Sequence, residues 1–155
     1  QDLEAQLAAA EAGKLTSRET GYVIERAMQA ANNPDAAVSL GKRWFDRAPS
    51  APLAAALGER IVTEKAGPVR FLRAPFPSRE AAAPEDFDAL WALAKTLAAN
   101  GANREAAEIV EILFVDSELD SAKANVALTE AANIARLGGM DFLEDLLRRR
   151  IEARR

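Results

Sequence analysis

The chain has 155 residues, a formal net charge of −4 and a pI near 5.0, so it lacks the cationic field that non-specific binding to nucleic acid requires. It contains neither cysteine nor histidine, which excludes disulfides, thiol nucleophiles and zinc sites of the Cys/His type. We therefore expect no nucleic acid partner, no metal and no cofactor.

Alanine and the spacing of apolar residues predict an all-α fold. Hydrophobic residues make up 49% of the chain and aromatic residues only 6%. Alanine, the best helix former, supplies much of the difference, and apolar positions recur every three or four residues. No apolar stretch approaches the roughly 18 residues that span a bilayer, so we expect no membrane insertion. Because Gln1 is not a start methionine, we expect a processed form or a piece of a larger protein.

Four helices are expected in the first part of the chain, each bounded by capping or breaking residues. The first covers residues 2–12 and ends at Gly13. Thr16 and Glu19 form a capping box that opens a helix over 17–31, and Asn33 before Pro34 opens another over 34–47. A fourth helix over 52–65 stops at the Gly-Pro pair at 67–68.

The remainder predicts about five more helices. Pro75 and Pro77 predict a short or broken helix over 69–83, because proline loses a hydrogen bond and clashes inside a regular helix. A clear helix follows over 84–100, then one over 104–115 capped by Asn103 and one over 121–137 capped by Ser121. Two glycines at 138–139 then turn the chain into a last helix that ends at the C-terminus.

One stretch carries a recognisable repeat pattern. It reads Leu90-x2-Leu93-Ala94-x2-Leu97-x3-Gly101, followed by Glu105-Ala106, and resembles the tetratricopeptide motif. Weaker copies predict repeats at 18–50, 51–86, 87–124 and 125–155, within one domain spanning 1–155. The resemblance implies stacked antiparallel helical hairpins, a tetratricopeptide-like α-solenoid of about nine helices. Other α-solenoids and a compact helical bundle remain as alternatives.

The same resemblance implies which residues bind a partner, because the first helices of tetratricopeptide repeats line a concave groove. Carried onto this chain, the groove positions include seven candidates: Tyr22, Arg26, Glu59, Trp91, Lys95, Asn133 and Arg136. A simpler interpretation exists for five of them, as hairpin core for the two aromatics and as ordinary solvated charge for Arg26, Lys95 and Glu59. The carboxylate clamp of chaperone-binding repeats does not occur at these positions.

Charged clusters give little indication of chemistry. The basic run over 148–155 is typical of a helix C-terminus, where cations face exposed carbonyls, although it could also dock an acidic surface. The pair Asp116 and Glu118 and the set Glu85, Asp86 and Asp88 lie at helix ends. Interaction with the helix dipole explains these carboxylates better than a role in acid–base catalysis does. We therefore expect no enzymatic activity.

The function that follows is a scaffold that holds another protein. An acidic, cysteine-free fragment rich in alanine and arginine also looks like the periplasmic repeat region of the outer-membrane component of the Pel exopolysaccharide-export system. That likeness implies a periplasmic location and, as partner, a polysaccharide-modifying enzyme. Two alternatives stay open: a helical accessory region of a cell-wall or glycan-acting enzyme such as a lytic transglycosylase, and a homo-oligomerisation module.

Overall fold

The protein is all-helical throughout the part that the computed structural model describes, namely residues 2–65, 83–115 and 121–154. These residues form nine α-helices and one short 3-10 helix, with no strand among them. The predicted all-α class and the expected number of helices are confirmed. The chain divides into two compact units, residues 1–68 and 69–155.

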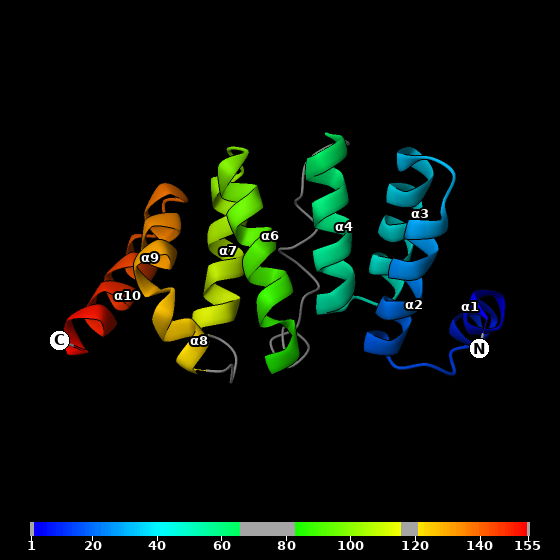
Figure 1. Cartoon of the computed structure of the whole chain (residues 1–155), viewed down its shortest axis with the longest axis horizontal. Helices are drawn as coiled ribbons and strands as arrows, with labels where there is room; N and C mark the ends of the chain where they lie inside the picture. The colour runs from blue at the N-terminus through cyan, green and yellow to red at the C-terminus, as the bar shows by residue number, and fades with distance from the viewer. Residues whose placement is uncertain (1, 66–82, 116–120, 155) are drawn as a thin grey trace. The chain divides into compact units, whose positions relative to one another are not determined.

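Unit 1 holds four helices: α1 (Leu3–Glu11), α2 (Ser17–Ala30), α3 (Pro34–Arg47) and α4 (Ala51–Glu64). Helix α1 packs against α2, while α2, α3 and α4 each pack against the other two (Figure 1). Since α4 contacts both members of the α2–α3 hairpin, the three helices enclose one shared core.

The starts of the helices in unit 1 follow from local side-chain chemistry. The Thr16 hydroxyl accepts a hydrogen bond from the Glu19 amide at 3.0 Å, and the Glu19 carboxylate accepts one from the Thr16 amide at 2.9 Å. Asn33 caps α3 and Ser50 caps α4 in the same way. The capping box at Thr16 and the cap at Asn33 are thus confirmed, and each satisfies amides that a helix leaves without intrahelical partners.

The core of unit 1 is built around the middle of α3. Trp44 and Phe45 are buried, and so are Met28 from α2 and Leu57 from α4. Gly41 of α3 lets these helices approach closely, because a Cβ at this position would lie 2.8 Å from Leu57 Cδ1 and 3.0 Å from Met28 Sδ. The close approach holds α2 and α4 in place for the groove described below.

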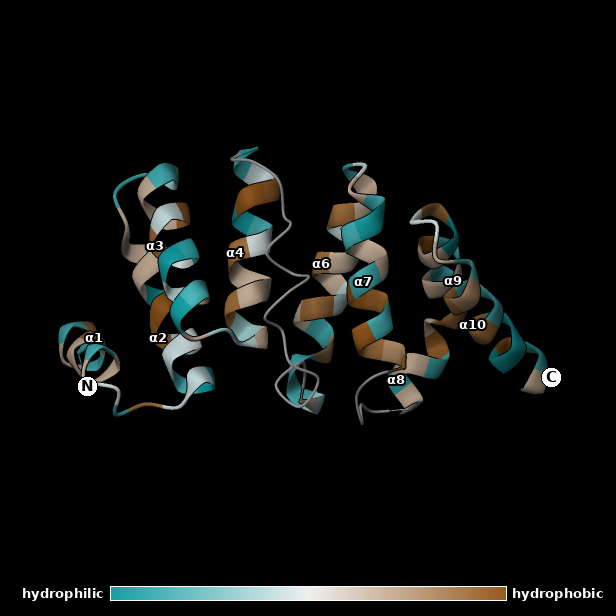
Figure 2. Cartoon of the chain, turned by 180° about the vertical axis from the view of Figure 1, so that it is seen from behind, coloured by the Kyte–Doolittle hydropathy of each residue, from teal (hydrophilic) through white to brown (hydrophobic). Residues whose placement is uncertain are grey.

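Unit 2 holds the 3-10 helix η2 (Pro84–Asp86) and five α-helices: α6 (Phe87–Ala99), α7 (Asn103–Phe114), α8 (Ser121–Val126), α9 (Leu128–Leu137) and α10 (Asp141–Ala153). Helix α6 packs on α7, α7 on α9, and α9 on α10. Polar and apolar residues alternate along α6 and α7 at helical spacing (Figure 2), as expected for helices with one buried face.

Two local predictions in unit 2 differ from the structure. The helix expected over 121–137 is divided at Ala127, whose amide donates to the Ala124 carbonyl at 3.0 Å in a tight turn. Helix α8 is bonded to α6 through Lys123 and Asp88, whereas α9 packs on α7 and α10. Asn103 is the first residue of α7 and Ala102 occupies the cap position without a side-chain bond.

Most of the expected broken helix over 69–83, with Pro75 and Pro77, lies outside the described residues. So do the connection at 117–120 and the pair Asp116 and Glu118. Of the helices that the structure describes, none has the length and apolar character needed to cross a membrane.

Candidate functional site

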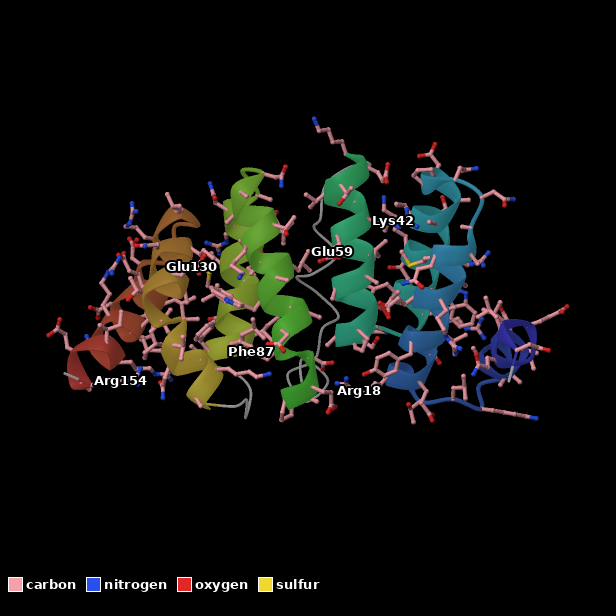
Figure 3. All side chains as sticks on the ribbon, in the orientation of Figure 1. Arg18, Lys42, Glu59, Phe87, Glu130 and Arg154 are labelled. Atoms are coloured by element: carbon pink, nitrogen blue, oxygen red, sulfur yellow. The ribbon has the colours of Figure 1, made fainter. Side chains whose placement is uncertain are left out.

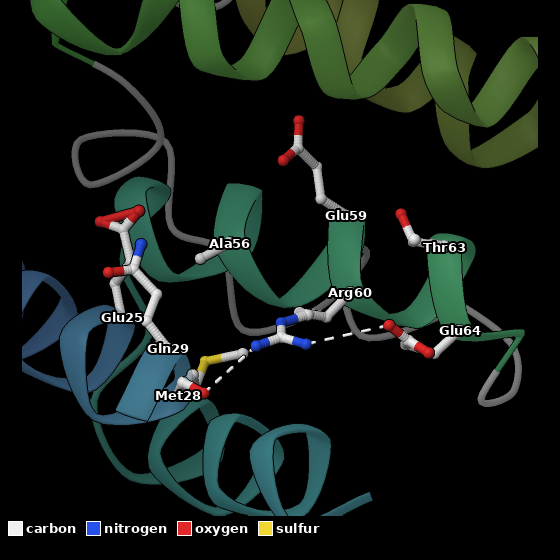
Figure 4. Close-up of a pocket in the computed structure, with 8 residues that line it drawn as sticks. All are labelled: Glu25, Met28, Gln29, Ala56, Glu59, Arg60, Thr63 and Glu64. Atoms are coloured by element: carbon white, nitrogen blue, oxygen red, sulfur yellow. Dashed lines mark hydrogen bonds and ion pairs between the residues drawn. The ribbon is translucent and has the colours of Figure 1, made fainter. Parts of the chain in front are cut away.

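A groove of about 330 Å³ runs between α2 and α4 within unit 1. Helix α2 contributes three residues and helix α4 five, and most are polar or charged. Figure 4 shows the whole set, which is Glu25, Met28, Gln29, Ala56, Glu59, Arg60, Thr63 and Glu64. Both helices pack on α3 in the shared core, so the packing of unit 1 sets the shape of the groove.

Arg60 is the cation among the described residues that line this groove. Its guanidinium contacts other residues of unit 1. Arg60 Nη2 donates to the main-chain carbonyl of Met28 at 3.3 Å, and Arg60 Nη1 lies 3.9 Å from Glu64 Oε1 (Figure 4). These contacts join α4 to α2 across the groove and draw the charge of Glu64 toward Arg60. The carboxylates of Glu25 and Glu59 then define the charge that the groove offers to a ligand.

Glu25 and Glu59 lie on neighbouring helices and influence each other. Partial burial raises the pKa of the Glu25 carboxyl above its ordinary value, and the negative charge of Glu59 raises it further. Both causes disfavour the ionised form of Glu25. A cation placed between the two carboxylates would relieve this repulsion, so the groove is suited to a positively charged group.

Glu25→Gln should stabilise unit 1 at neutral pH and lose that advantage in acid. Since the pKa of Glu25 is raised on folding, ionisation costs stability as the pH rises through the window between the ordinary value, about 4.3, and the raised one. Below that window the carboxyl is neutral in both states and the cost disappears. Urea unfolding followed by Trp44 fluorescence in a Trp91→Phe background, at pH 7 and in acid, measures the difference between the variant and the parent.

The control for this experiment is Glu130→Gln, which removes an exposed carboxylate from α9 of unit 2 (Figure 3). It should leave the pH dependence of the Trp44 transition unchanged. An equal change in stability of the Glu25→Gln variant at both pH values would show that the loss of the Glu25 charge does not cause the stabilisation.

The three predicted binding residues of unit 1 have different surroundings. Glu59 lines the α2/α4 groove. Tyr22 lies on α2 and is 43% exposed. Arg26 faces α1, where its Nη2 donates to the side-chain oxygen of Gln6. The structure thus brings Glu59 into a groove, and it places the Arg26 guanidinium in a contact with the helix that precedes α2.

In unit 2 the structure brings two predicted residues together. The Lys95 ammonium lies 5.4 Å from the centre of the Trp91 ring, within cation–π range. The Trp91 ring also meets Phe114 of α7 edge to face, with centroids 5.5 Å apart and planes at 71°. Trp91 is therefore half-buried, with one part of the ring in the hairpin and another beneath Lys95.

The last two predicted residues lie on α9 and are exposed. Asn133 Oδ1 accepts a hydrogen bond from Arg148 Nη2 of α10 at 3.1 Å. Arg136 is near the end of α9, close in sequence to the glycine turn.

Glu25 and Arg60 also line the groove, although neither is among the residues predicted from the sequence. Glu25 precedes Gln29 by four residues, which puts the two side chains on one face of α2. Arg60 follows Glu59 directly, and its part in the groove depends on the Met28 carbonyl, which no local pattern predicts.

The charged clusters at helix ends make contacts within unit 2. Asp86 is buried and accepts a hydrogen bond from the Ala83 amide at 2.8 Å, while Asp88 pairs with Lys123 at 3.1 Å. In the basic run, Arg150 donates to the Phe114 carbonyl and Arg154 to the Asn125 carbonyl. Within the described ranges, no group of three or more acidic side chains is placed to hold a metal ion.

Comparison of the chain with models of protein families, with curated proteins and with solved structures finds no match.

Proposed function

We propose that this chain is a protein-protein interaction scaffold of tetratricopeptide type, whose α2/α4 groove receives a polypeptide segment that carries lysine or arginine. The observation that supports it most is the position of Glu59, a predicted groove residue of the second repeat, which lines the groove together with Glu25 and raises the pKa of that carboxyl. Gln29 lines the same groove.

The packing of unit 1 supports the repeat interpretation. Helices α2 and α3 are joined by the short connection around Asn33, and short connections make neighbouring helices pack as a hairpin. Helix α4 then packs against both helices of that hairpin, as the first helix of a following repeat would. In such an arrangement the groove lies between successive first helices, here α2 and α4.

The lining of the groove supports a peptide segment as its ligand. Glu25 and Glu59 attract an ammonium or guanidinium group, and charge-assisted hydrogen bonds are stronger than neutral ones. Ala56 supplies apolar contact for the alkyl stem of a lysine or arginine side chain. Gln29 and Thr63 carry an amide and a hydroxyl that can bond to a peptide backbone.

The location and the wider role belong to the same proposal. A cysteine-free, acidic chain suits the oxidising periplasm. Its richness in alanine and arginine supports a part in exopolysaccharide export or secretion. In that setting the partner is a polysaccharide-modifying enzyme, and this chain positions the enzyme without catalysing a reaction.

Selection of short random peptides on the immobilised chain tests the groove. Peptides rich in lysine or arginine should be enriched, and Glu59→Lys should weaken their binding by about tenfold or more, because it reverses the charge that holds the cation. Isothermal titration with one selected peptide measures the affinity of each variant.

Glu130→Lys is the matched control, since it makes the same charge reversal on an exposed residue of α9 in unit 2. Its affinity for the selected peptide should equal that of the parent. Enrichment of peptides without basic residues, or unchanged binding to the Glu59→Lys variant, would contradict the proposal. Circular dichroism of each variant shows that the helices are retained.

A further inference from the structure

An apolar side chain projects from the first turn of α10. Phe142 is 84% exposed, although a phenylalanine of this size normally buries a large area. Leu146 follows four residues later and is half-buried, so the two side chains share one face of the helix. We name Phe142 and Leu146 the α10 knob. The pair gives this face of α10 an exposed apolar surface.

A second groove in unit 1 offers a receptor for such a knob. It has a volume of about 600 Å³ and lies between α1, α2 and α3. Leucine and alanine dominate its lining, with Leu3, Leu7, Ala27, Ala31, Ala36 and Leu40 as its apolar residues and Arg43 as its cation. We name it the α1 groove. It shares no residue with the α2/α4 groove.

We propose that the α10 knob of one copy of this chain docks in the α1 groove of a second copy. The groove is apolar and large enough for two big side chains. Its alanines are small and leave room for Phe142 and Leu146 to enter. Because one chain carries both surfaces, every solution of the protein contains the knob and its receptor at equal concentration. The proposal uses none of the residues of the α2/α4 groove and stands independently of the peptide-binding function.

Charge supports a second copy as the occupant. Asp141 is exposed and stands next to Phe142 in the sequence, and Arg43 is an exposed cation of the α1 groove. One pair of opposite charge, Asp141 and Arg43, thus stands beside the apolar contact and gives the docking a complementary charge.

The proposed contact joins two different surfaces, so it is heterologous. Each docked copy leaves one knob and one groove available, and association continues head to tail unless a ring closes. The wild-type chain should therefore form dimers and then longer species as its concentration rises. Sedimentation velocity of the full chain at concentrations up to about 1 mM detects this series.

Two variants separate the two surfaces. Phe142→Ser removes the knob at an exposed position, and Ala36→Glu puts a carboxylate into the groove from an exposed residue in the first turn of α3, where negative charge favours the helix. Each variant alone should weaken association by about tenfold or more. An equal mixture should form a one-to-one complex and nothing longer, since only one productive knob and groove remain.

Matched controls are Val126→Ser, which removes an apolar side chain that is 89% exposed on α8, and Ala92→Glu, which adds a carboxylate to an exposed alanine on α6. Both should associate like the wild type. The proposal is overturned if the wild type stays monomeric over the whole range or if the mixture forms no complex. Loss of association in Phe142→Ser but not in Ala36→Glu would also overturn it, because that result indicates symmetric pairing of α10.

Discussion

Replacing Phe45 with alanine should lower the free energy of unfolding of unit 1 by about 3–5 kcal/mol. Phe45 is 1% exposed and lies in α3, the helix that packs against both α2 and α4. The change removes the buried ring and leaves a cavity that the surrounding helices can fill only in part. A loss of this size is a large share of the total stability of a small domain.

The two tryptophans of the chain allow this loss to be assigned to one unit, because Trp44 lies in unit 1 and Trp91 in unit 2. In a Trp91→Phe background only Trp44 reports, and urea unfolding followed by its fluorescence gives the stability of unit 1. Tyr22→Ala is the matched control, since it truncates an exposed aromatic on α2. It should cost less than about 1 kcal/mol.

An equal loss in the Phe45 and Tyr22 variants would contradict the assignment of Phe45 to the core. The result also bears on the proposed function, because α2 and α4 form the peptide groove only while α3 holds them together. A Phe45→Ala variant should therefore lose peptide binding at urea concentrations that leave the parent folded.

Gly138→Ala is expected to lower the free energy of unfolding of unit 2 by about 2–3 kcal/mol. Gly138 ends α9 with a φ of −82°, a conformation that alanine adopts without strain, so the backbone is no obstacle. The added Cβ would lie 2.5 Å from Ala107 Cβ and 2.6 Å from the Asn103 carbonyl oxygen. Both atoms belong to α7, and the contact with Asn103 is with the backbone, so α7 and α9 must separate.

Gly139→Ala separates this steric effect from backbone strain. Gly139 has a φ of +74°, and a Cβ added there would meet no heavy atom within 4 Å beyond its own chain neighbours. Its cost of about 1 kcal/mol therefore comes from the left-handed conformation alone. Trp91 fluorescence in a Trp44→Phe background measures both variants. The Gly138 effect should exceed the Gly139 effect, and the opposite order would contradict the close packing of α7 against α9.

A double variant tests the contact directly. Ala107→Gly removes the nearer atom, so the combination with Gly138→Ala should be less destabilised than the sum of the two single changes. Recovery should be partial, because the Asn103 carbonyl remains in place. Strict additivity would indicate that the two positions do not touch.

Local chemistry was sufficient to predict most of the helices. Thr16 and Asn33 mark helix starts, because their side chains accept the first free amides of the helix that follows. Gly13 and Gly101 mark helix ends, because both adopt positive φ. The contact of Lys95 with Trp91 also follows from spacing, since residues four apart share one face of a helix.

Local chemistry failed where a contact from another helix decides the outcome. No proline or glycine occurs at the break at Ala127. The helices α8 and α9 on either side of it contact different helices. Arg26 is predicted to face a partner-binding groove, yet its guanidinium bonds to Gln6 of α1. No spacing rule within α2 could predict that partner.

Caps, breakers and apolar periodicity act within a few residues, so the order of amino acids is enough to predict that this protein is helical and where most of its helices begin and end. The pairing of charges depends on how the helices pack. Glu25 and Glu59 face one groove because Gly41 and the buried side chains around it bring α2 and α4 together on α3. The acidic groove therefore depends on packing between helices, which acts over distances that a local pattern does not encode.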